Sequence, residues 1–297
     1  MPEYREIIDN PRSERIRRIA ELSERRRRQR YGRFMIEGPQ CVREAVACQP
    51  QCLLDIYVEV EPDAGMKPVS TAAAQIRNSA LKAAPRAYIH YVSSRTMQAI
   101  SKDAQGIVAV GRLEDLQVQA NSLLLPQDQT GQAESVQVAA LWQVRDPGNE
   151  GTIIRTADAA GLQALLLVDD CVDPFSPKVL RATAGSIFHI PVVQVSTDEF
   201  FTWVQTRQLP VVAADVYGTS DRVPVSLPDM LAQSKEAASG LALLFGNEAR
   251  GLPTALLERS DSIVSIPIYG KAESLNLAMS AAVLLYSLAM SSRLGRM

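Results

Sequence analysis

The sequence predicts an α/β protein with two units, of which the C-terminal one is built on a parallel sheet. Its 297 residues are more than one hydrophobic core usually organises. Short apolar runs alternate with helix-like segments along most of the chain, which is the pattern of α/β domains. The apolar runs of the C-terminal half are nearly uninterrupted, as expected for parallel strands covered on both faces.

Residues 1–33 are predicted to form an arginine-rich helical extension. Ile16, Ile19 and Leu22 recur at helical spacing. Between Arg12 and Arg33 the sequence has ten arginines and three glutamates. Because the net charge of the whole chain is only −2, this excess of positive charge is local.

Residues 34–116 are predicted to form a small α/β domain. Its candidate strands are Phe34–Ile36, Leu53–Val58, Tyr88–Val92 and Ile107–Val110, and its candidate helices are Pro39–Ala47, Val69–Ala83 and Ser94–Ser101. Residues 117–137 are rich in glutamine and serine and have little periodicity, which predicts a linker between two domains.

Residues 138–297 are predicted to form the second domain. Its candidate strands are Val138–Val144, Ala164–Val168, Ile190–Val195, Val211–Ala214, Leu241–Phe245 and Ile263–Ile266, and its main candidate helices are Thr152–Ala160, Pro177–Ala184, Asp198–Arg207 and Leu275–Met290. Open parallel sheets bind ligands at the carboxyl ends of their strands. Motifs that follow these strands are therefore the candidate functional sites.

Several kinds of site are excluded by motifs that the sequence lacks. It contains no G-x-G-x-x-G, Walker loop, G-x-S-x-G or H-E-x-x-H pattern, which excludes the common dinucleotide, P-loop, hydrolase and zinc-protease sites. Its four cysteines and two histidines include no C-x-x-C pair and too few well-spaced ligands for zinc, so no metal is expected.

The sequence favours a soluble cytoplasmic protein without a membrane partner. The N-terminus lacks the apolar core of a signal peptide, and the cysteines suggest no disulfide framework. The most apolar stretch, Leu275–Met290, is interrupted by polar residues and is short for a membrane span. It is interpreted as a buried core or interface helix.

The first candidate motif is the loop Asp146–Gly151, which follows a predicted strand and opens the helix that carries Arg155. A helix N-terminus offers unpaired N–H groups and a positive dipole end, which suit a phosphate. Asn149 can cap this helix or donate to a ligand, and Arg155 can extend its guanidinium toward a phosphate. A tight turn with a salt-bridged arginine would explain the same residues.

The second motif is Leu243–Pro253, in which a buried strand ends in Gly246. Glycines at a strand end let the backbone approach a flat ligand closely, and Gly251 allows a further sharp turn. A purely structural turn explains this motif equally well.

The third motif is Ile266–Met290, in which a strand exits through Pro267 and Gly270. Ser274 or Asn276 then caps a long apolar helix. A capped core helix accounts for the helix itself, but not for the polar residues that crowd its start.

In this order the three motifs resemble those of the SpoU/TrmH family of ribose 2′-O-methyltransferases, in the SPOUT superfamily. The family patterns N-x-G-x-x-x-R, F-G-N-E and I-P-x-x-G with S-L-N correspond to Asn149, Gly151 and Arg155, to Phe245–Glu248, and to Ile266, Pro267, Gly270, Ser274, Leu275 and Asn276. The resemblance covers 138–297, including Pro174–Val192, with Ala249 in place of an expected glycine. Tyr31–Val46 is similar to the ribosomal-protein-like substrate-binding domain often fused in front.

The resemblance implies a fold, a cofactor and an assembly. Such proteins have a deep trefoil knot, which would thread the chain near 243–280 and hold a bent S-adenosylmethionine. They are usually homodimers, and the helix Leu275–Met290 suits an interface. The implied cofactor-binding residues are Leu243, Leu244, Phe245, Gly246, Asn247, Ile266, Pro267, Ile268 and Leu275.

The resemblance also points to Arg155 as a catalytic residue. Methyl transfer to a ribose hydroxyl depends on positioning and on stabilising a poor nucleophile. Because arginine is effectively always protonated, Arg155 is expected to grip the adjacent phosphate and stabilise the developing alkoxide rather than act as a base. Glu248 and Asn149 would orient it. Ser274 and Asn276 would contact the ribose or the cofactor.

The expected substrate is structured RNA. Arg25, Arg26, Arg27, Arg28 and Arg33 are predicted to contact its phosphates, although a solvated helix paired with nearby glutamates would explain them too. The substrate-binding domain favours ribosomal over transfer RNA. A base-modifying enzyme and a catalytically silent RNA-binding protein are alternatives. The S-L-N form of the third motif favours ribose, and the intact set of motif residues favours catalysis.

Overall fold

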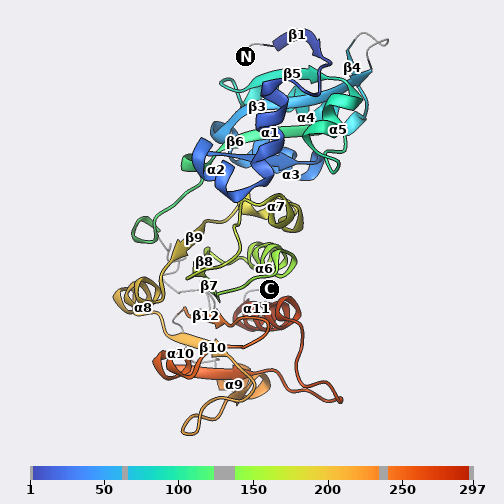
Figure 1. Cartoon of the computed structure of the whole chain (residues 1–297). Coiled ribbons are helices and arrows are strands. Elements are labelled where there is room, and N and C mark those ends of the chain that lie inside the picture. Colours follow the sequence, from blue (N-terminus) through green and yellow to red (C-terminus); the bar gives the residue numbers. More distant parts are fainter. Residues whose placement is uncertain (1–2, 62–65, 124–137, 234–239, 294–297) are drawn as a thin grey trace. The chain divides into compact units, whose positions relative to one another are not determined.

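The computed structural model describes residues 3–61, 66–123, 138–233 and 240–293 (Figure 1). Contacts divide the chain into two compact units, each made of two segments. The first unit comprises Met1–Gln117 and Asp173–His189, and the second comprises Val118–Val172 and Ile190–Met297. Within the described residues, no helix is long and apolar enough to span a membrane.

The first unit contains a mixed sheet in the order β1-β5-β3-β6-β2, with β4 paired to β3. These strands are β1 (Glu3–Ile8), β2 (Arg33–Glu37), β3 (Leu53–Glu61), β4 (Lys67–Pro68), β5 (Tyr88–Val92) and β6 (Ile107–Arg112). β1, β5 and β3 are parallel, whereas β6 is antiparallel to β3 and to β2. The helices are α1 (Glu14–Ala20), α2 (Arg25–Tyr31), α3 (Pro39–Cys48), α4 (Thr71–Ala83), α5 (Ser94–Ile100) and α7 (Pro177–Thr183). Helix α7 was predicted within the second domain, but it belongs to the first unit, where Arg181 pairs with Glu37.

The N-terminal segment differs from the predicted helical extension. Helices α1 and α2 lie where the spacing predicts them, but residues 3–8 form β1 because they pair in parallel with β5. The predicted helix is therefore wrong for this stretch. Ile16, Ile19 and Leu22 are buried in one cluster with side chains of β2, β3 and β6, so this segment is part of the first unit's core.

The second unit contains the predicted parallel sheet, in the order β11-β13-β10-β12-β7-β8-β9. Its strands are β7 (Val138–Trp142), β8 (Ala164–Val168), β9 (Val192–Val195), β10 (Val211–Ala214), β11 (Val225–Ser226), β12 (Ala242–Phe245) and β13 (Ser262–Ser265). Its helices are α6 (Pro147–Ala160), α8 (Thr197–Thr206), α9 (Leu227–Gln233), α10 (Thr254–Arg259) and α11 (Leu277–Arg293). The short elements β11, α9 and α10 were not predicted from the sequence.

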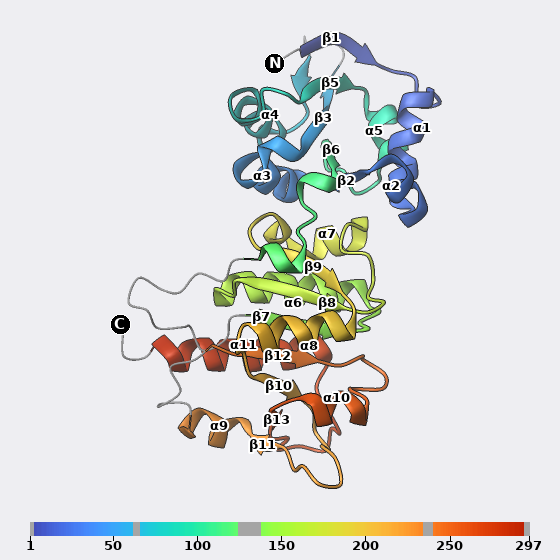
Figure 2. The same cartoon turned by 90° about the vertical axis from the view of Figure 1, so that its left-hand side faces the viewer.

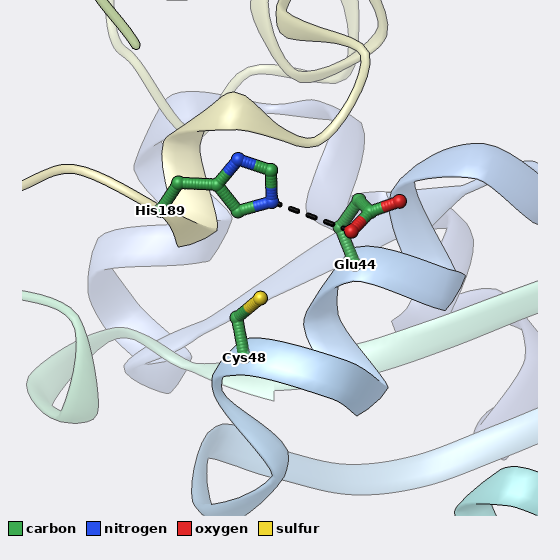
Figure 3. Close-up of side chains that lie close together, drawn as sticks. All are labelled: Glu44, Cys48 and His189. Atoms are coloured by element: carbon green, nitrogen blue, oxygen red, sulfur yellow. Dashed lines mark hydrogen bonds and ion pairs between the residues drawn. The ribbon is translucent and has the colours of Figure 1, made fainter. Parts of the chain in front are cut away.

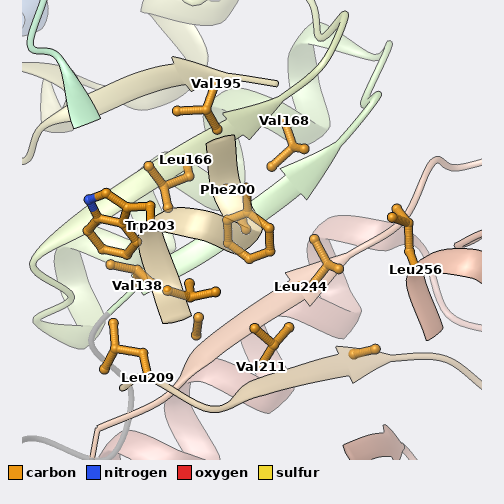
Figure 4. Packing of buried hydrophobic residues seen from close by; sticks show 14 of the residues in the cluster. Val138, Leu166, Val168, Val195, Phe200, Trp203, Leu209, Val211, Leu244 and Leu256 are labelled. Atoms are coloured by element: carbon orange, nitrogen blue, oxygen red, sulfur yellow. The ribbon is translucent and has the colours of Figure 1, made fainter. Parts of the chain in front are cut away.

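Helices cover both faces of this sheet, which explains its uninterrupted apolar strands. Figures 1 and 2 show α6 and α11 on one face and α8 and α10 on the other. Phe200 and Trp203 of α8 pack with strand residues such as Leu166 and Leu244 in one buried cluster (Figure 4). Helix α8 begins with a capping box formed by Ser196 and Glu199.

The predicted linker is described only at its start. Residues 124–137 lie outside the described residues. Leu123 is buried in the second unit's core, and the indole N–H of Trp203 donates to the carbonyl of Ala120 at 2.8 Å. Residues 118–123 therefore pack as part of the second unit.

Candidate active site

A cavity of about 360 Å³ lies where β10, β12 and β13 end. Phe245 is in register with Ala214 of β10 and Leu141 of β7, so these parallel strands end at the same edge of the sheet. The cavity is lined by residues 214–217, 245–251, 264–266, 268, 273–275, 277, 280 and 284. Its size is in the range of small-molecule sites, about 300–1,000 Å³.

The turn after β12 requires glycine at one position. A Cβ on Gly246 would lie 2.4 Å from the carbonyl carbon of Gly251 and 2.6 Å from its oxygen. Asn247 and Gly251 exchange two backbone hydrogen bonds of 3.1 and 2.8 Å, and Gly251 has a φ of +64°. Only glycine allows this close approach. Ala249, which replaces an expected glycine, does not have a positive φ and so causes no backbone strain there.

Glu248 links the second motif to the first. One of its oxygens accepts from the backbone N–H of Asp146 at 3.0 Å and from the Asn149 amide at 3.3 Å, and the other accepts from the N–H of Arg145 at 3.2 Å. The side chain that caps α6 is Asp146, which accepts from the N–H of Asn149 at 2.7 Å. Asn149 therefore leaves its amide for other partners.

Asn276 links the third motif to the first. Its side-chain oxygen caps α11 by accepting from the N–H groups of Ala278 and Met279 at 2.9 and 3.3 Å. Its amide donates to the side-chain oxygen of Asn149 at 3.1 Å. Glu248, Asn149 and Asn276 therefore form one chain of hydrogen bonds that joins all three motifs.

The remaining predicted site residues are placed differently. The cavity is lined by Phe245, Gly246, Asn247, Ile266, Ile268, Ser274 and Leu275, whereas Leu243, Leu244 and Pro267 are not among its lining residues. Leu243 and Leu244 are buried within β12. Arg155 is exposed on α6, and no hydrogen bond or ion pair of the described residues involves it. It also does not line the cavity.

The loop that follows β10 also lines the cavity, and it was not predicted from the sequence. Asp215, Val216 and Tyr217 line the cavity, and one oxygen of Asp215 accepts from the N–H groups of Tyr217 and Gly218, both at 2.8 Å. A polar residue directly after a predicted buried strand was the available signal, because this strand ends at the same edge as β12.

The arginine run of α2 divides into different environments. Arg28 is 2% exposed, and its guanidinium donates to Asp173 at 3.0 and 2.6 Å and to the carbonyls of Leu22 and Ser23 at 2.8 Å. Its prediction as an RNA contact is therefore corrected, because its donors are used inside the first unit. Arg26 and Arg33 are exposed, and Arg27 lies 3.7–3.8 Å from Glu21 and Glu24.

Three residues of metal-binding type come together in the first unit, although one of them is distant in the sequence from the other two. Glu44 and Cys48 lie one turn apart on α3, and candidate ligand atoms of these residues and His189 all lie within 4.8 Å of one another (Figure 3). His189 Nε2 is 3.3 Å from a carboxylate oxygen of Glu44, so a hydrogen bond accounts for this pair. Within the described residues, this group supplies three of the four ligands typical of zinc.

Comparisons with known proteins identify the family of both parts of the chain. A model of the SpoU rRNA Methylase family matches residues 137–286, and a model of the MRM3-like substrate binding domain matches residues 13–109. The 23S rRNA (guanosine(2553)-2′-O)-methyltransferase RlmP of Bacillus subtilis (strain 168) is 33% identical over 281 residues, 95% of this chain and 98% of the relative.

Two further relatives cover most of the chain. The 23S rRNA (guanosine-2′-O-)-methyltransferase RlmB of Neisseria meningitidis is 26% identical, over 84% of this chain and 92% of the relative. An AdoMet-bound rRNA methyltransferase from Sinorhizobium meliloti has a TM-score of 0.78 and 27% identity, and each chain is covered to 98%. RNA 2′-O-methylation with S-adenosylmethionine is the activity of this family of methyltransferases, and it was predicted from the sequence. The chain belongs to the SpoU rRNA methylase family.

Proposed function

We propose that this protein transfers a methyl group from S-adenosylmethionine to a ribose 2′-hydroxyl of ribosomal RNA. The observation that carries the proposal is the hydrogen-bonded chain of Glu248, Asn149 and Asn276, which joins the three motifs beside a cavity at the strand ends. The similar proteins named above support ribosomal RNA as the substrate.

The size and the lining residues of the cavity support its proposed role as the cofactor site. Apolar side chains that include Phe245, Ile266 and Leu275 line it and suit the flat adenine ring. The carboxylates of Asp215 and Glu273 also line it and suit a ligand that carries positive charge. The bound cofactor would supply an activated methyl group. We propose that Leu243, Leu244 and Pro267 act only indirectly, by positioning the backbone of these turns.

The residues of the chain would activate the hydroxyl and hold it in place. We propose that Arg155 grips the phosphate beside the target ribose and stabilises negative charge on the 2′-oxygen, since its guanidinium has no partner within the described residues. Asn149 would be held in place by Glu248 and Asn276 and would face the ribose. Ser274, at the cavity wall, would contact the ribose or the cofactor.

We propose that residues 34–116, with the preceding helices, bind RNA and that 138–297 carry the methyltransferase activity. Arg25, Arg26, Arg27 and Arg33 remain the proposed phosphate contacts, and Arg28 is removed from this set. Contacts of this kind are largely independent of sequence and depend strongly on salt. We propose that the protein acts in the cytoplasm, as expected for a protein similar to bacterial rRNA methyltransferases.

The proposed trefoil knot is supported by the path of the chain near 243–280. β13 is separated from β12 by β10 in the sheet, yet α11, which follows β13, packs against α6. The chain must therefore return across the sheet after β13. This return passes through the third motif, beside the turn that follows β12.

The proposed homodimer is supported by an apolar stripe on α11. Met279, Val283, Tyr286 and Met290 follow helical spacing and are 38–57% exposed, whereas the opposite face of α11 is buried. An exposed apolar stripe on a helix is typical of a surface that another protein covers. Analytical ultracentrifugation of wild type and Tyr286→Glu would test this, with a shift toward monomer expected for the variant.

The function itself is tested on RNA from cells that lack the gene. Purified protein with methyl-labelled S-adenosylmethionine should methylate their ribosomal RNA at a ribose, and mapping of 2′-O-methyl groups should find the same position methylated in wild-type cells. The reaction should proceed in EDTA. Calorimetry that detects no cofactor binding to folded protein, or strict dependence on a divalent ion, would contradict the proposal. Labelling of transfer RNA alone would support the alternative substrate.

A further inference from the structure

The first unit contains a cavity of about 610 Å³ bounded by α1, α2 and the strands β2, β3 and β6. Buried side chains of Ile19, Leu22 and Val110 form an apolar wall, and Tyr31 and Tyr57 add two aromatic rings. A simple basic surface that attracts RNA does not need an apolar cavity of this size.

The cavity carries a positive charge that the protein does not neutralise. Four arginines (15, 18, 30 and 33) and two carboxylates (Glu14 and Asp55) line it, which gives a formal charge of +2. Glu14 pairs with Arg18, and Asp55 pairs with Arg15. Neither the Arg30 nor the Arg33 side chain has a hydrogen bond or ion pair within the part of the chain that the structure describes, and the Arg30 guanidinium lies over the Tyr31 ring at 5.9 Å. Two guanidinium groups are therefore available to a ligand.

One wall of the cavity is fixed by hydrogen bonds. Arg15 donates from Nε to the Tyr57 hydroxyl at 2.9 Å and from Nη2 to Asp55 at 3.1 Å. His90 Nε2 lies 2.7 Å from both Arg15 and Asp55, and because Arg15 can only donate and Asp55 can only accept, it serves one of them at a time. The His90 ring also stacks on Tyr57 at 4.8 Å. This wall is therefore preorganised before a ligand binds.

We infer that this cavity binds one unpaired nucleotide of the RNA substrate. Arg30 and Arg33 hold its phosphate, and its base packs on Tyr31 and the apolar wall. The inference depends on the proposed function, which supplies RNA as the partner. Guanidinium groups bind phosphates through paired hydrogen bonds, and bases of single-stranded RNA stack on aromatic side chains. A paired base cannot enter, because it remains within its helix.

The charge part of this inference is tested by binding of a ten-nucleotide, mixed-sequence, fluorescently labelled RNA to the full chain. Arg30→Gln/Arg33→Gln should weaken binding of the single strand about tenfold or more and reduce the slope of log Kd against log salt by about 0.7–1.4. The matched control is Lys82→Gln/Arg86→Gln, which removes the same charge from exposed positions outside the cavity. On the duplex of the same sequence, both double variants should behave alike.

The stacking part is tested at Tyr31. Tyr31→Leu should weaken single-strand binding about fivefold or more without changing the salt slope, because stacking on one base contributes independently of charge. Tyr31→Phe should bind like wild type, although it loses the hydroxyl contact with Glu21. Thermal melting of both variants separates a binding defect from a folding defect.

Three results would overturn the inference. One is equal single-strand affinity for Arg30→Gln/Arg33→Gln and its control. Another is unchanged affinity for a folded Tyr31→Leu, which would reduce the cavity to a charged surface. The third is that uridine 5′-monophosphate displaces the labelled strand as strongly as the unlabelled strand does. This result would indicate a site for a free nucleotide. These are binding measurements, so failure to methylate ribosomal RNA would contradict the proposed function separately.

Discussion

The proposed cofactor cavity of the second unit and the arginine-lined cavity of the first unit are built by different means. The backbone shapes the cavity of the second unit. The turn after β12 excludes a Cβ at Gly246, and backbone N–H groups at the start of α6 fix Glu248. Side chains shape the other, which depends on how each arginine is paired. A site shaped by the backbone tolerates few residue types at its turns. In a site shaped by side chains, forming or breaking one ion pair changes which ligand can bind.

The arginines of residues 12–33 show, within one short segment, how a site depends on the pairing of its side chains. Arg28 is buried and fully committed to the protein, and Arg15 holds a wall of the cavity. The side chains of Arg30 and Arg33 have no hydrogen bond or ion pair within the described residues, although Arg30 lies over the Tyr31 ring at 5.9 Å. Residues of one type, a few positions apart, therefore stabilise the fold, organise a site or remain available to a ligand.

The largest effect is expected at Arg28, from a comparison of a buried and an exposed arginine of the same helix. Arg28→Gln should lower the free energy of unfolding by about 3–5 kcal/mol, because it leaves the mostly buried Asp173 without its partner. Arg26→Gln, at an exposed position of the same helix, should change it by about 0.5 kcal/mol or less. Urea unfolding measures both. Similar changes in the free energy of unfolding for the two variants would show that the buried and the exposed arginine of this helix do not differ in their contribution to stability.

Substitution of Arg155 tests whether one side chain is essential for methylation at a site that is otherwise shaped by the backbone. Arg155→Ala should lose methylation rate by about a hundredfold or more, as for removal of one preorganised donor, with cofactor affinity nearly unchanged. Arg155→Lys should retain more activity than alanine, because a point charge still attracts phosphate. Single-turnover kinetics and calorimetry measure the two quantities. Full activity of a folded Arg155→Ala protein would remove Arg155 from the mechanism.

A pair of glycines tests the backbone part of the comparison. Gly246→Ala should cost about 1–3 kcal/mol of stability and weaken cofactor binding, because its Cβ would overlap the backbone at Gly251. At Gly270 an added Cβ meets no atom within 4 Å, so Gly270→Ala is the matched control and should change stability little. Equal effects of the two substitutions would show that the turn after β12 adapts.

The same difference explains what could be predicted from the sequence. Strands β5, β8 and β10 begin and end at the predicted residues, since they are mostly buried runs of mostly apolar residues. The motif residues Asn149, Glu248 and Asn276 were identified because their order and spacing matched a known family. By contrast, the burial of Arg28 depends on Asp173, 145 residues away, and β1 depends on pairing with a distant β5. Nothing local in the sequence encodes such partners.

The smallest effect is expected at Asp55, which tests how firmly the wall of the arginine-lined cavity is held. Burial raises the pKa of Asp55, but the hydrogen bond from His90 and the charges of His90, Arg15 and Arg33 outweigh it, so the pKa lies below its usual 3.8. A carboxyl with a lowered pKa stabilises the folded state above its unfolded pKa, and this contribution is lost as the pH falls through the folded value.

Asp55→Asn should therefore cost about 1 kcal/mol near neutral pH, where the carboxylate of the wild type is charged. Below pH 3.8 the difference should shrink, because a protonated Asp55 resembles asparagine in charge. Thermal unfolding at a series of pH values measures this convergence. Glu114→Gln, at an exposed position of the same unit, is the control and should show no such trend. A gap between wild type and Asp55→Asn that persists in acid would mean that Asp55 stabilises the wall by shape rather than by charge.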